Sequence, residues 1–299
     1  MKIGFGLPVS GSWATPDVVA DVARRADELG YATLWSFQRL LVPTETPLEP
    51  QYRSVADPLL PLAYAAALTT RARLGAAIVN MPFQPPAVLA KQYATLDVLS
   101  GGRAVAGLGL GWVPEEFEAV GVPFERRGTR GEEYVAALRA LWGPDPVSFD
   151  GDLYRVPESS VLPKPVRPGG PPILIGGGAP PALERCGRIA DGWISSSRAD
   201  PDTIDQPIEA VRAAAREAGR SDAELEFVVR GVVLVGKRTR PLTGTLDEIR
   251  DDLPALAGKG VTEVFVDLNF DPRIGNPDAD PKESLARATD VLEALAPGR

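Results

Sequence analysis

Residues 103–117, RAVAGLGLGWVPEEF, place glycines at three alternate positions (Gly107, Gly109 and Gly111) between an apolar run and the acidic start of a helix. A glycine-rich strand end of this kind occurs in sheets that bind dinucleotides, where the fingerprint is G-x-G-x-x-G. The third glycine of that fingerprint would fall on Trp112, so the spacing disfavours a dinucleotide site. Successive strand residues point to opposite faces, so the three glycines share one face. There they either make room for a flat ligand or relieve crowding between strands.

The same pattern, a strand followed by a helix, recurs along the whole chain. Strands are expected over 2–7, 33–36, 73–79, 103–110, 172–176, 192–196, 225–235 and 262–268. Helices are expected over 16–29, 58–70, 86–100, 129–142, 180–190, 203–218, 245–258 and 282–296. Most of the strands are continuous apolar runs, which is typical of strands covered on both faces. Eight such units without a break in composition predict a single α/β domain over 1–299, a closed (β/α)8 TIM barrel.

Two segments interrupt the repeat and predict loop and hairpin insertions. The proline-rich stretch 38–57, QRLLVPTETPLEPQYRSVAD, is too long for a routine connection between a strand and a helix. The segment 147–156, VSFDGDLYRV, is typical of a β-hairpin with its turn at Asp150-Gly151.

Composition excludes several classes of protein. The 299 residues include 40 acidic and 32 basic side chains, so the net charge of −8 disfavours nucleic-acid binding. No apolar stretch approaches the ~18 residues of a membrane span, and the N-terminal residues form a strand pattern, not a secretory signal. A single cysteine, Cys186, allows no intrachain disulfide and is expected to be a small buried apolar residue. We therefore expect a cytoplasmic protein with neither a nucleic-acid partner nor a membrane partner.

The chain contains no histidine, which restricts its chemistry most. Ser-His-Asp and Cys-His nucleophilic systems are excluded. No metal site is expected, because the usual zinc ligands are missing. Any reaction must use carboxylates, amides, hydroxyls, arginines or a bound cofactor.

Residues 171–186, PPILIGGGAPPALERC, end a strand in three glycines just before a helix that opens on two prolines. Backbone N–H groups of such a glycine-rich turn can bind an anion, although the same sequence also makes an ordinary tight turn. The next strand end, DGWISSSR (191–198), adds hydroxyls and one positive charge, and neighbouring strand ends meet at the same barrel mouth. The candidate phosphate-binding residues are Gly176, Gly177, Gly178, Ser195, Ser196 and Arg198.

Other candidates follow neighbouring strands. Asn80 ends one of them, where its amide can bind a ligand or cap a turn. Trp112 lies at another strand end, where an aromatic side chain walls a planar ligand or packs at the rim. Glu115 and Glu116 are candidate proton donors, although acidic residues are common in a first helical turn.

Several longer stretches, taken in order, resemble the bacterial luciferase-like superfamily, and most of all its deazaflavin (coenzyme F420)-dependent oxidoreductases. The resemblance covers nearly the whole chain and implies a TIM barrel that binds F420 or FMN at its carboxyl-terminal mouth. The stretches are GYATLWSFQRL (30–40), RLGAAIVNMPFQPPAVLAKQYATLDVLSGGRAVAGLGLGW (73–112), PKPVRPGGPPILIGGG (163–178), ADGWISSS (190–197) and GTLDEI with KGVTEVFV (244–249 and 259–266).

The resemblance also implies roles for single residues. Ala77-Ile78 matches the family's non-prolyl cis peptide, which lies behind the central flavin ring. Gly177, Gly178 and Ser196 match the phosphate-binding positions. Gly109, with Gly111, is then expected to shape the floor and rim of a flavin pocket.

The chain departs from the family pattern at the usual acid and base. Many relatives carry Asp-His after the second strand, where this chain has Phe37-Gln38. Relatives that oxidise sugar phosphates carry a glutamate at the position of Trp112. Alcohol oxidation by a histidine base is therefore not expected, and neither is the luciferase-type oxygen chemistry that uses that histidine.

The resemblance predicts a reductase in which reduced F420 delivers hydride to an activated C=C or C=N bond of a small substrate. Gln38 and Asn80 would orient the ring edge or substrate, Trp112 would wall the pocket, and Glu115, Tyr52, Asp57 or water would supply the proton. An FMN-dependent monooxygenase served by a separate flavin reductase is the alternative, and a non-catalytic flavin-binding barrel is the third hypothesis. The family also implies a homodimer.

Overall fold

The computed structural model describes residues 1–297, in which eight strand positions form a closed parallel barrel. β1 pairs with both β2 and β13, and the pairing of β3 with β5 closes the barrel. Ala77 and Ile78 separate β3 from β4, so these two short strands fill one barrel position. The barrel strands are β1 (Lys2–Gly6), β2 (Thr33–Ser36), β3 (Arg73–Ala76), β4 (Val79–Asn80), β5 (Ala104–Gly109), β8 (Ile173–Gly176), β9 (Gly192–Ile194), β10 (Glu226–Val232) and β13 (Glu263–Asp267).

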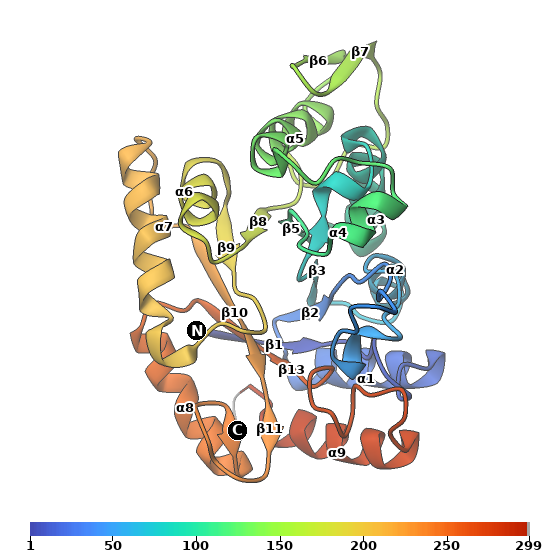
Figure 1. The fold of residues 1–299 in the computed structure, drawn as a ribbon, viewed down its shortest axis with the longest axis vertical. Coiled ribbons are helices and arrows are strands. Elements are labelled where there is room, and N and C mark those ends of the chain that lie inside the picture. Colours follow the sequence, from blue (N-terminus) through green and yellow to red (C-terminus); the bar gives the residue numbers. More distant parts are fainter. Residues whose placement is uncertain (298–299) are drawn as a thin grey trace.

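Helices lie outside the strands, with α7 and α8 on one side and α2 and α3 on the other (Figure 1). They are α1 (Pro16–Leu29), α2 (Leu60–Ala66), α3 (Pro86–Ser100), α4 (Pro114–Ala119), α5 (Arg127–Trp142), α6 (Pro180–Ile189), α7 (Asp205–Glu217), α8 (Leu246–Gly258) and α9 (Pro281–Ala294). Local signals set their ends: the Thr15 hydroxyl accepts from Val18 N before α1, and Gly30 ends α1 in the left-handed conformation. The predicted TIM-type barrel is confirmed.

Tertiary side-chain contacts move several predicted boundaries. α2 is shorter than the expected 58–70, because Asp57 caps its start at Leu59 N and the Arg103 guanidinium binds the carbonyls of Ala66 and Thr69 at its end. The strand expected over 73–79 is interrupted at 77–78, and the one expected over 225–235 is divided into β10 and β11 (Leu234–Val235). α4 begins at the expected acidic helix start, but it is a separate short helix that ends before α5.

The hairpin insertion is confirmed, with antiparallel strands β6 (Val147–Asp150) and β7 (Arg155–Ser159) extending beyond the barrel (Figure 1). A second small sheet, in which β11 pairs with β12 (Thr243–Gly244), was not predicted. No helix within residues 1–297 is long and apolar enough to cross a membrane. Cys186 is buried as expected, and burial raises the pKa of its thiol to about 12.

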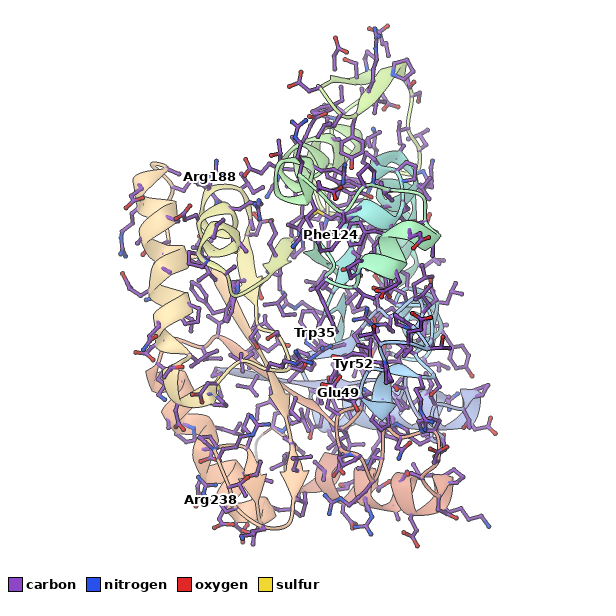
Figure 2. The ribbon with its side chains drawn as sticks, in the orientation of Figure 1. Trp35, Glu49, Tyr52, Phe124, Arg188 and Arg238 are labelled. Atoms are coloured by element: carbon purple, nitrogen blue, oxygen red, sulfur yellow. The ribbon has the colours of Figure 1, made fainter. Side chains whose placement is uncertain are left out.

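The barrel interior is filled around Trp35, which lies near the centre of the molecule (Figure 2). Its ring stacks on Phe265 with centroids 5.3 Å apart, and its indole N–H donates to Glu263 Oε1 at 2.8 Å. Glu263 also accepts from the Thr33 hydroxyl at 3.1 Å and from Arg73 Nη2 at 3.1 Å, while Arg73 forms two further bonds to Glu226. This network closes the end of the barrel opposite the mouth.

Candidate active site

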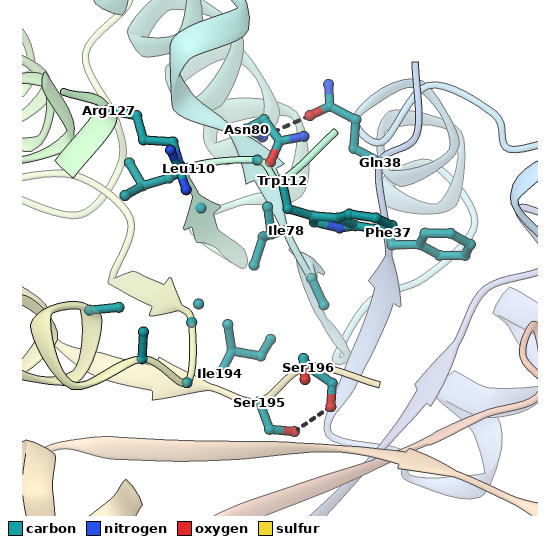
Figure 3. A pocket seen from close by; sticks show the side chains of 18 of the residues that line it. Phe37, Gln38, Ile78, Asn80, Leu110, Trp112, Arg127, Ile194, Ser195 and Ser196 are labelled. Atoms are coloured by element: carbon teal, nitrogen blue, oxygen red, sulfur yellow. Dashed lines mark hydrogen bonds between the residues drawn. The ribbon is translucent and has the colours of Figure 1, made fainter. Parts of the chain in front are cut away.

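A cavity of about 580 Å³ opens at the carboxyl-terminal mouth of the barrel (Figure 3). Its wall contains strand ends, with Asn80 from β4, Gly109 from β5, Gly176 from β8 and Ile194 from β9. Phe37 comes from the loop after β2. This is the end at which TIM barrels carry their active sites, because the loops that follow the strands converge there.

The structure brings most of the predicted site residues into this one wall. They are Gln38, Ala77, Ile78, Asn80, Gly109, Trp112, Gly176, Gly177, Gly178, Ser195 and Ser196. Glu115 lies half-buried on α4 and is not part of the wall. Arg198 borders a second cavity of about 390 Å³, which shares Gly178 and Ser196 with the first, and its guanidinium binds Glu49 at 2.8 Å.

The back wall is formed by the Ala77–Ile78 segment, whose peptide bond is cis, as the resemblance implied. A Cβ on Gly109 would lie 2.4 Å from Ile78 Cδ1, and one on Gly107 would lie 1.8 Å from the Ala76 carbonyl oxygen. The alternate glycines of residues 103–117 thus have two different functions. Gly107 relieves crowding inside the barrel, whereas Gly109 and Gly111 line the cavity, and Gly109 makes room for the Ile78 side chain.

A polar edge runs along one side of the cavity. Asn80 N donates to Gln38 Oε1 at 2.7 Å, which fixes the Gln38 side chain against β4 (Figure 3). The Asn80 side chain is 4% exposed, and its amide has no protein partner in the part of the chain that the structure describes. A ligand carbonyl or amide would satisfy it.

The turn after β8 presents unpaired backbone donors. Trp193 Nε1 donates to the Gly177 carbonyl at 2.7 Å, which holds the turn. Pro180 and Pro181 have no N–H, and the N–H groups of Ala182 and Leu183 donate to Ala179 O. Within residues 1–297, the N–H groups of Gly177, Gly178 and Ala179 have no protein acceptor. This turn can therefore bind an anion, supported by the hydroxyls of Ser195 and Ser196.

The charged side chains of the cavity wall are all arginines, although the chain has a net charge of −8. Five arginines line it, and none of its described residues is an aspartate or a glutamate. Besides them, Tyr52 is the ionisable side chain in the wall. The arginines are Arg39, Arg126, Arg127, Arg185 and Arg230.

Arg39 and Glu116 form a buried ion pair beside the cavity, which sequence reasoning missed. Arg39 Nη1 lies 2.5 Å from Glu116 Oε2, with side chains 4% and 0% exposed, and Leu40 N donates to Glu116 Oε1 at 2.6 Å. The guanidinium carbon lies 4.9 Å from the Tyr52 ring centroid and 4.7 Å from that of Trp112, so it fixes both rings. Burial raises the pKa of Glu116, against the opposing effects of Leu40 N–H and Arg39.

Arg230 is a second missed residue, and a charged side chain in the apolar strand EFVVRGV was the signal that could have found it. Its side chain is 8% exposed and reaches across the barrel, where Nη2 donates to the Ala77 carbonyl oxygen at 2.6 Å. Its Nε lies 3.1 Å from Asp267 Oδ2, and its guanidinium carbon lies 4.9 Å from the Phe270 ring centroid. Arg230 thereby braces the back wall of the cavity.

The model of the family described as "Luciferase-like monooxygenase" matches residues 4–263. The chain belongs to this family. It is 32% identical over 307 residues to an uncharacterized protein of Mycobacterium tuberculosis, with 99% of each chain covered. The expected family membership is confirmed, and the protein is an oxidoreductase of the luciferase-like type.

Two further relatives of the luciferase-like protein differ in the cofactor that they use. An F420-dependent glucose-6-phosphate dehydrogenase of Kineococcus radiotolerans is 29% identical over 77% of this chain and 66% of its own length. An FMNH2-dependent dimethylsulfone monooxygenase of Pseudomonas putida is 34% identical over 52% of this chain and 43% of its own. Family membership therefore indicates an F420- or FMN-dependent enzyme and does not choose between these cofactors.

Solved structures share the barrel. The monooxygenase RslO1 of Streptomyces bottropensis superposes with a TM-score of 0.80 at 23% identity, and 99% of each chain is covered. The F420-dependent tetrahydromethanopterin reductase of Methanopyrus kandleri superposes with a TM-score of 0.74 at 19% identity, covering 99% of this chain and 98% of its own. At these identities the superpositions establish the fold.

Proposed function

We propose that this protein is an F420H2-dependent reductase that transfers hydride to an activated C=C or C=N bond of a small organic substrate. The observation that carries the proposal is a single cavity that joins the Ile78 wall to the unpaired N–H groups of Gly177, Gly178 and Ala179. A flat ring fits against Ile78 and Gly109, and a phosphate fits the N–H groups. The cationic wall favours a cofactor with several negative charges.

When bound, the cofactor supplies the hydride, and the protein supplies position and electrostatics. Gln38, fixed by Asn80 N, presents its amide N–H groups at the cavity edge, and the free Asn80 amide orients the ring edge or a substrate carbonyl. Tyr52 and Trp112, held by Arg39, cover the substrate side and limit the entry of water. Arg230 keeps the Ala77–Ile78 wall in place from the opposite strand.

The proton for such a reduction comes from the Tyr52 hydroxyl or from water. The chain has no histidine, and no aspartate or glutamate of residues 1–297 belongs to the cavity wall. Glu115 and Asp57, the other candidates, lie outside that wall. A Tyr52→Phe variant should therefore lower the proton-transfer rate while leaving cofactor affinity unchanged.

A binding titration tests the proposal: oxidised F420 and FMN are each added to the purified protein and followed by cofactor fluorescence. We expect F420 to bind, and Gly177→Asp to abolish its binding, because a carboxylate then stands where the phosphate must sit. Gly177→Ala is the matched control, since it introduces the same Cβ, 2.8 Å from Ala182 Cβ, at the same positive φ (131°) but adds no charge. F420 binding that survives Gly177→Asp would refute the phosphate site.

The same titration separates the alternatives. Binding of FMN alone, with hydroxylation of a substrate by reduced FMN and oxygen, would identify a monooxygenase that needs a separate flavin reductase. Tight cofactor binding without turnover of any acceptor would identify a non-catalytic flavin-binding barrel.

We further propose a homodimer. Apolar side chains stand exposed on the outer faces of α2 and α3, among them Leu60 at 71%, Leu99 at 63% and Val88 at 46%. Large apolar side chains exposed on neighbouring helices favour a surface that is covered in an assembly. Light scattering after size exclusion should give twice the chain mass of 31.8 kDa, and a monomeric mass would contradict the proposal.

A further inference from the structure

Three of the cavity arginines lie together at one side, where the start of α5 faces α6. Arg126 is the N-cap residue of α5, and Arg127 is its first residue. Arg185 comes from α6, which also contributes Pro181 and Ala182 to the cavity wall. Arg127 points into the cavity (Figure 3). This basic cluster, Arg126, Arg127 and Arg185, shares the cavity wall with the unpaired amides of Gly177, Gly178 and Ala179.

Arg185 lines the cavity from α6 and lies against the start of α5. Its side chain is 9% exposed, and its Nε lies 3.3 Å from Glu132 Oε1. A Cβ on Gly128 would lie 2.6 Å from Arg185 Nη2, so only glycine at 128 lets the guanidinium approach α5 this closely. In the described chain, Nη1 and Nη2 of Arg185 donate to no protein acceptor. A buried guanidinium with unused donors is satisfied best by an anionic ligand.

The other two arginines leave charge uncompensated at the same place. The Arg126 side chain forms no ion pair or hydrogen bond within residues 1–297, although its backbone carbonyl accepts from Arg130 N at 3.1 Å. Arg127 Nη1 donates to the Phe124 carbonyl at 3.3 Å, and its guanidinium carbon lies 3.9 Å from the Phe124 ring centroid, so no carboxylate neutralises it. The carboxylate of Glu132 is shared between Arg185 and Arg188. Positive charge at the start of a helix is unfavourable by itself, which also points to a bound anion.

We propose that the basic cluster is a second anion subsite, which binds carboxylates in the tail of the cofactor beyond its phosphate. This inference rests on the proposed function, because it takes the phosphate to lie on the amides of residues 177–179. The ligand class is a polyanionic tail in which carboxylates follow a phosphodiester, as in F420. FMN, with one terminal phosphate, has no group that reaches the cluster once that phosphate is bound, so the cluster selects the cofactor.

The test compares three ligands: F420, the riboside of the same ring, which lacks phosphate and tail, and FMN. Each is titrated against the wild-type protein and an Arg126→Ala/Arg127→Ala variant at two salt concentrations. We expect the variant to bind F420 about tenfold more weakly, with a shallower salt dependence, because two charged contacts are lost. The affinities for the riboside and FMN should change less than about twofold.

An Arg130→Ala/Arg188→Ala variant is the matched control, since it removes two charges from α5 and α6 at residues outside the cavity wall. It should leave F420 affinity unchanged, and an Arg126→Lys/Arg127→Lys variant should recover most of the lost affinity. Thermal unfolding of every variant checks that the fold is intact. Equal weakening of F420 and riboside, or no weakening of F420, would overturn the subsite alone. Failure of the wild-type protein to bind F420 would overturn the proposed function together with the subsite.

Discussion

The two ends of the barrel interior treat buried charge in opposite ways. At the closed end, Glu263 accepts from Trp35, Thr33 and Arg73, and Arg73 also binds Glu226. At the mouth, Arg39 Nε is buried without a hydrogen-bond partner, and Arg230 Nε and Asp267 Oδ2 form an ion pair at 3.1 Å in which neither atom makes a hydrogen bond. The first arrangement stabilises the fold through a connected hydrogen-bond network, whereas the second leaves buried polar atoms without hydrogen bonds. Stability and function thus occupy different ends of one cylinder.

The largest effect is expected from breaking the closed end. Glu263→Ala should lower the free energy of unfolding by about 3–5 kcal/mol, because Arg73 and the Trp35 N–H lose a fully buried partner. Asn80→Ala at the mouth should cost less than about 1 kcal/mol, because the Asn80 amide has no protein partner to lose. Urea denaturation of both variants measures the difference. Equal losses would contradict the contrast between the two ends.

A smaller effect is expected from the glycines of the mouth. Gly109→Ala should destabilise the protein by about 1–2 kcal/mol, because the new methyl group pushes against the Ile78 side chain. Gly178→Ala should stay within about 0.5 kcal/mol of the wild type, since a Cβ there meets nothing within 4 Å. Thermal unfolding of the two variants checks this pair. A Gly109→Ala protein that unfolds at the same temperature as the wild type would show that the back wall is not tightly packed.

The smallest effect concerns pH, where the two ends should respond with opposite sign. Burial alone would raise the pKa of Glu226, but the hydrogen bond and charge of Arg73 outweigh it, so this pKa lies below its ordinary value. Its contribution to stability is present above about pH 4.3 and is lost as the pH falls through the folded-state pKa. The pKa of Glu116 is raised by burial, so its contribution is present below about pH 4.3 and is lost as the pH rises through its folded-state pKa.

Denaturation of the wild type, Glu226→Gln and Glu116→Gln between pH 3 and 7 tests these signs. Glu226→Gln should flatten the loss of stability on the acid side, and Glu116→Gln should flatten the change in stability above about pH 4.3. If the free energy of unfolding changes with pH in the same way in all three proteins, neither glutamate causes the pH dependence assigned to it.

Local patterns predicted the barrel and the backbone half of the site. Alternating strands and helices gave the eight units, and short motifs located Gly109 and Gly177 because glycine meets a purely local demand of the chain. The five arginines of the wall were all missed. Arg39 meets Glu116 across 77 residues and Arg230 meets Ala77 across 153, so these contacts exist only once the barrel closes. Boundaries failed for the same reason at α2, where Arg103 arrives from a later strand to end the helix.

The bond from Arg230 to the Ala77 carbonyl spans the lumen from β10 to the break between β3 and β4. Positions 77, 78 and 230 therefore form one structural unit, although they are far apart in the chain. If β10 were exchanged for the matching strand of another barrel, the bond from Arg230 would be lost. The Ala77–Ile78 wall would then be disturbed, although β10 contributes none of its backbone. Libraries of variants that aim to reshape the cavity should vary these three positions together. A substitution at one position alone would have to pack against two residues that still suit the original side chain.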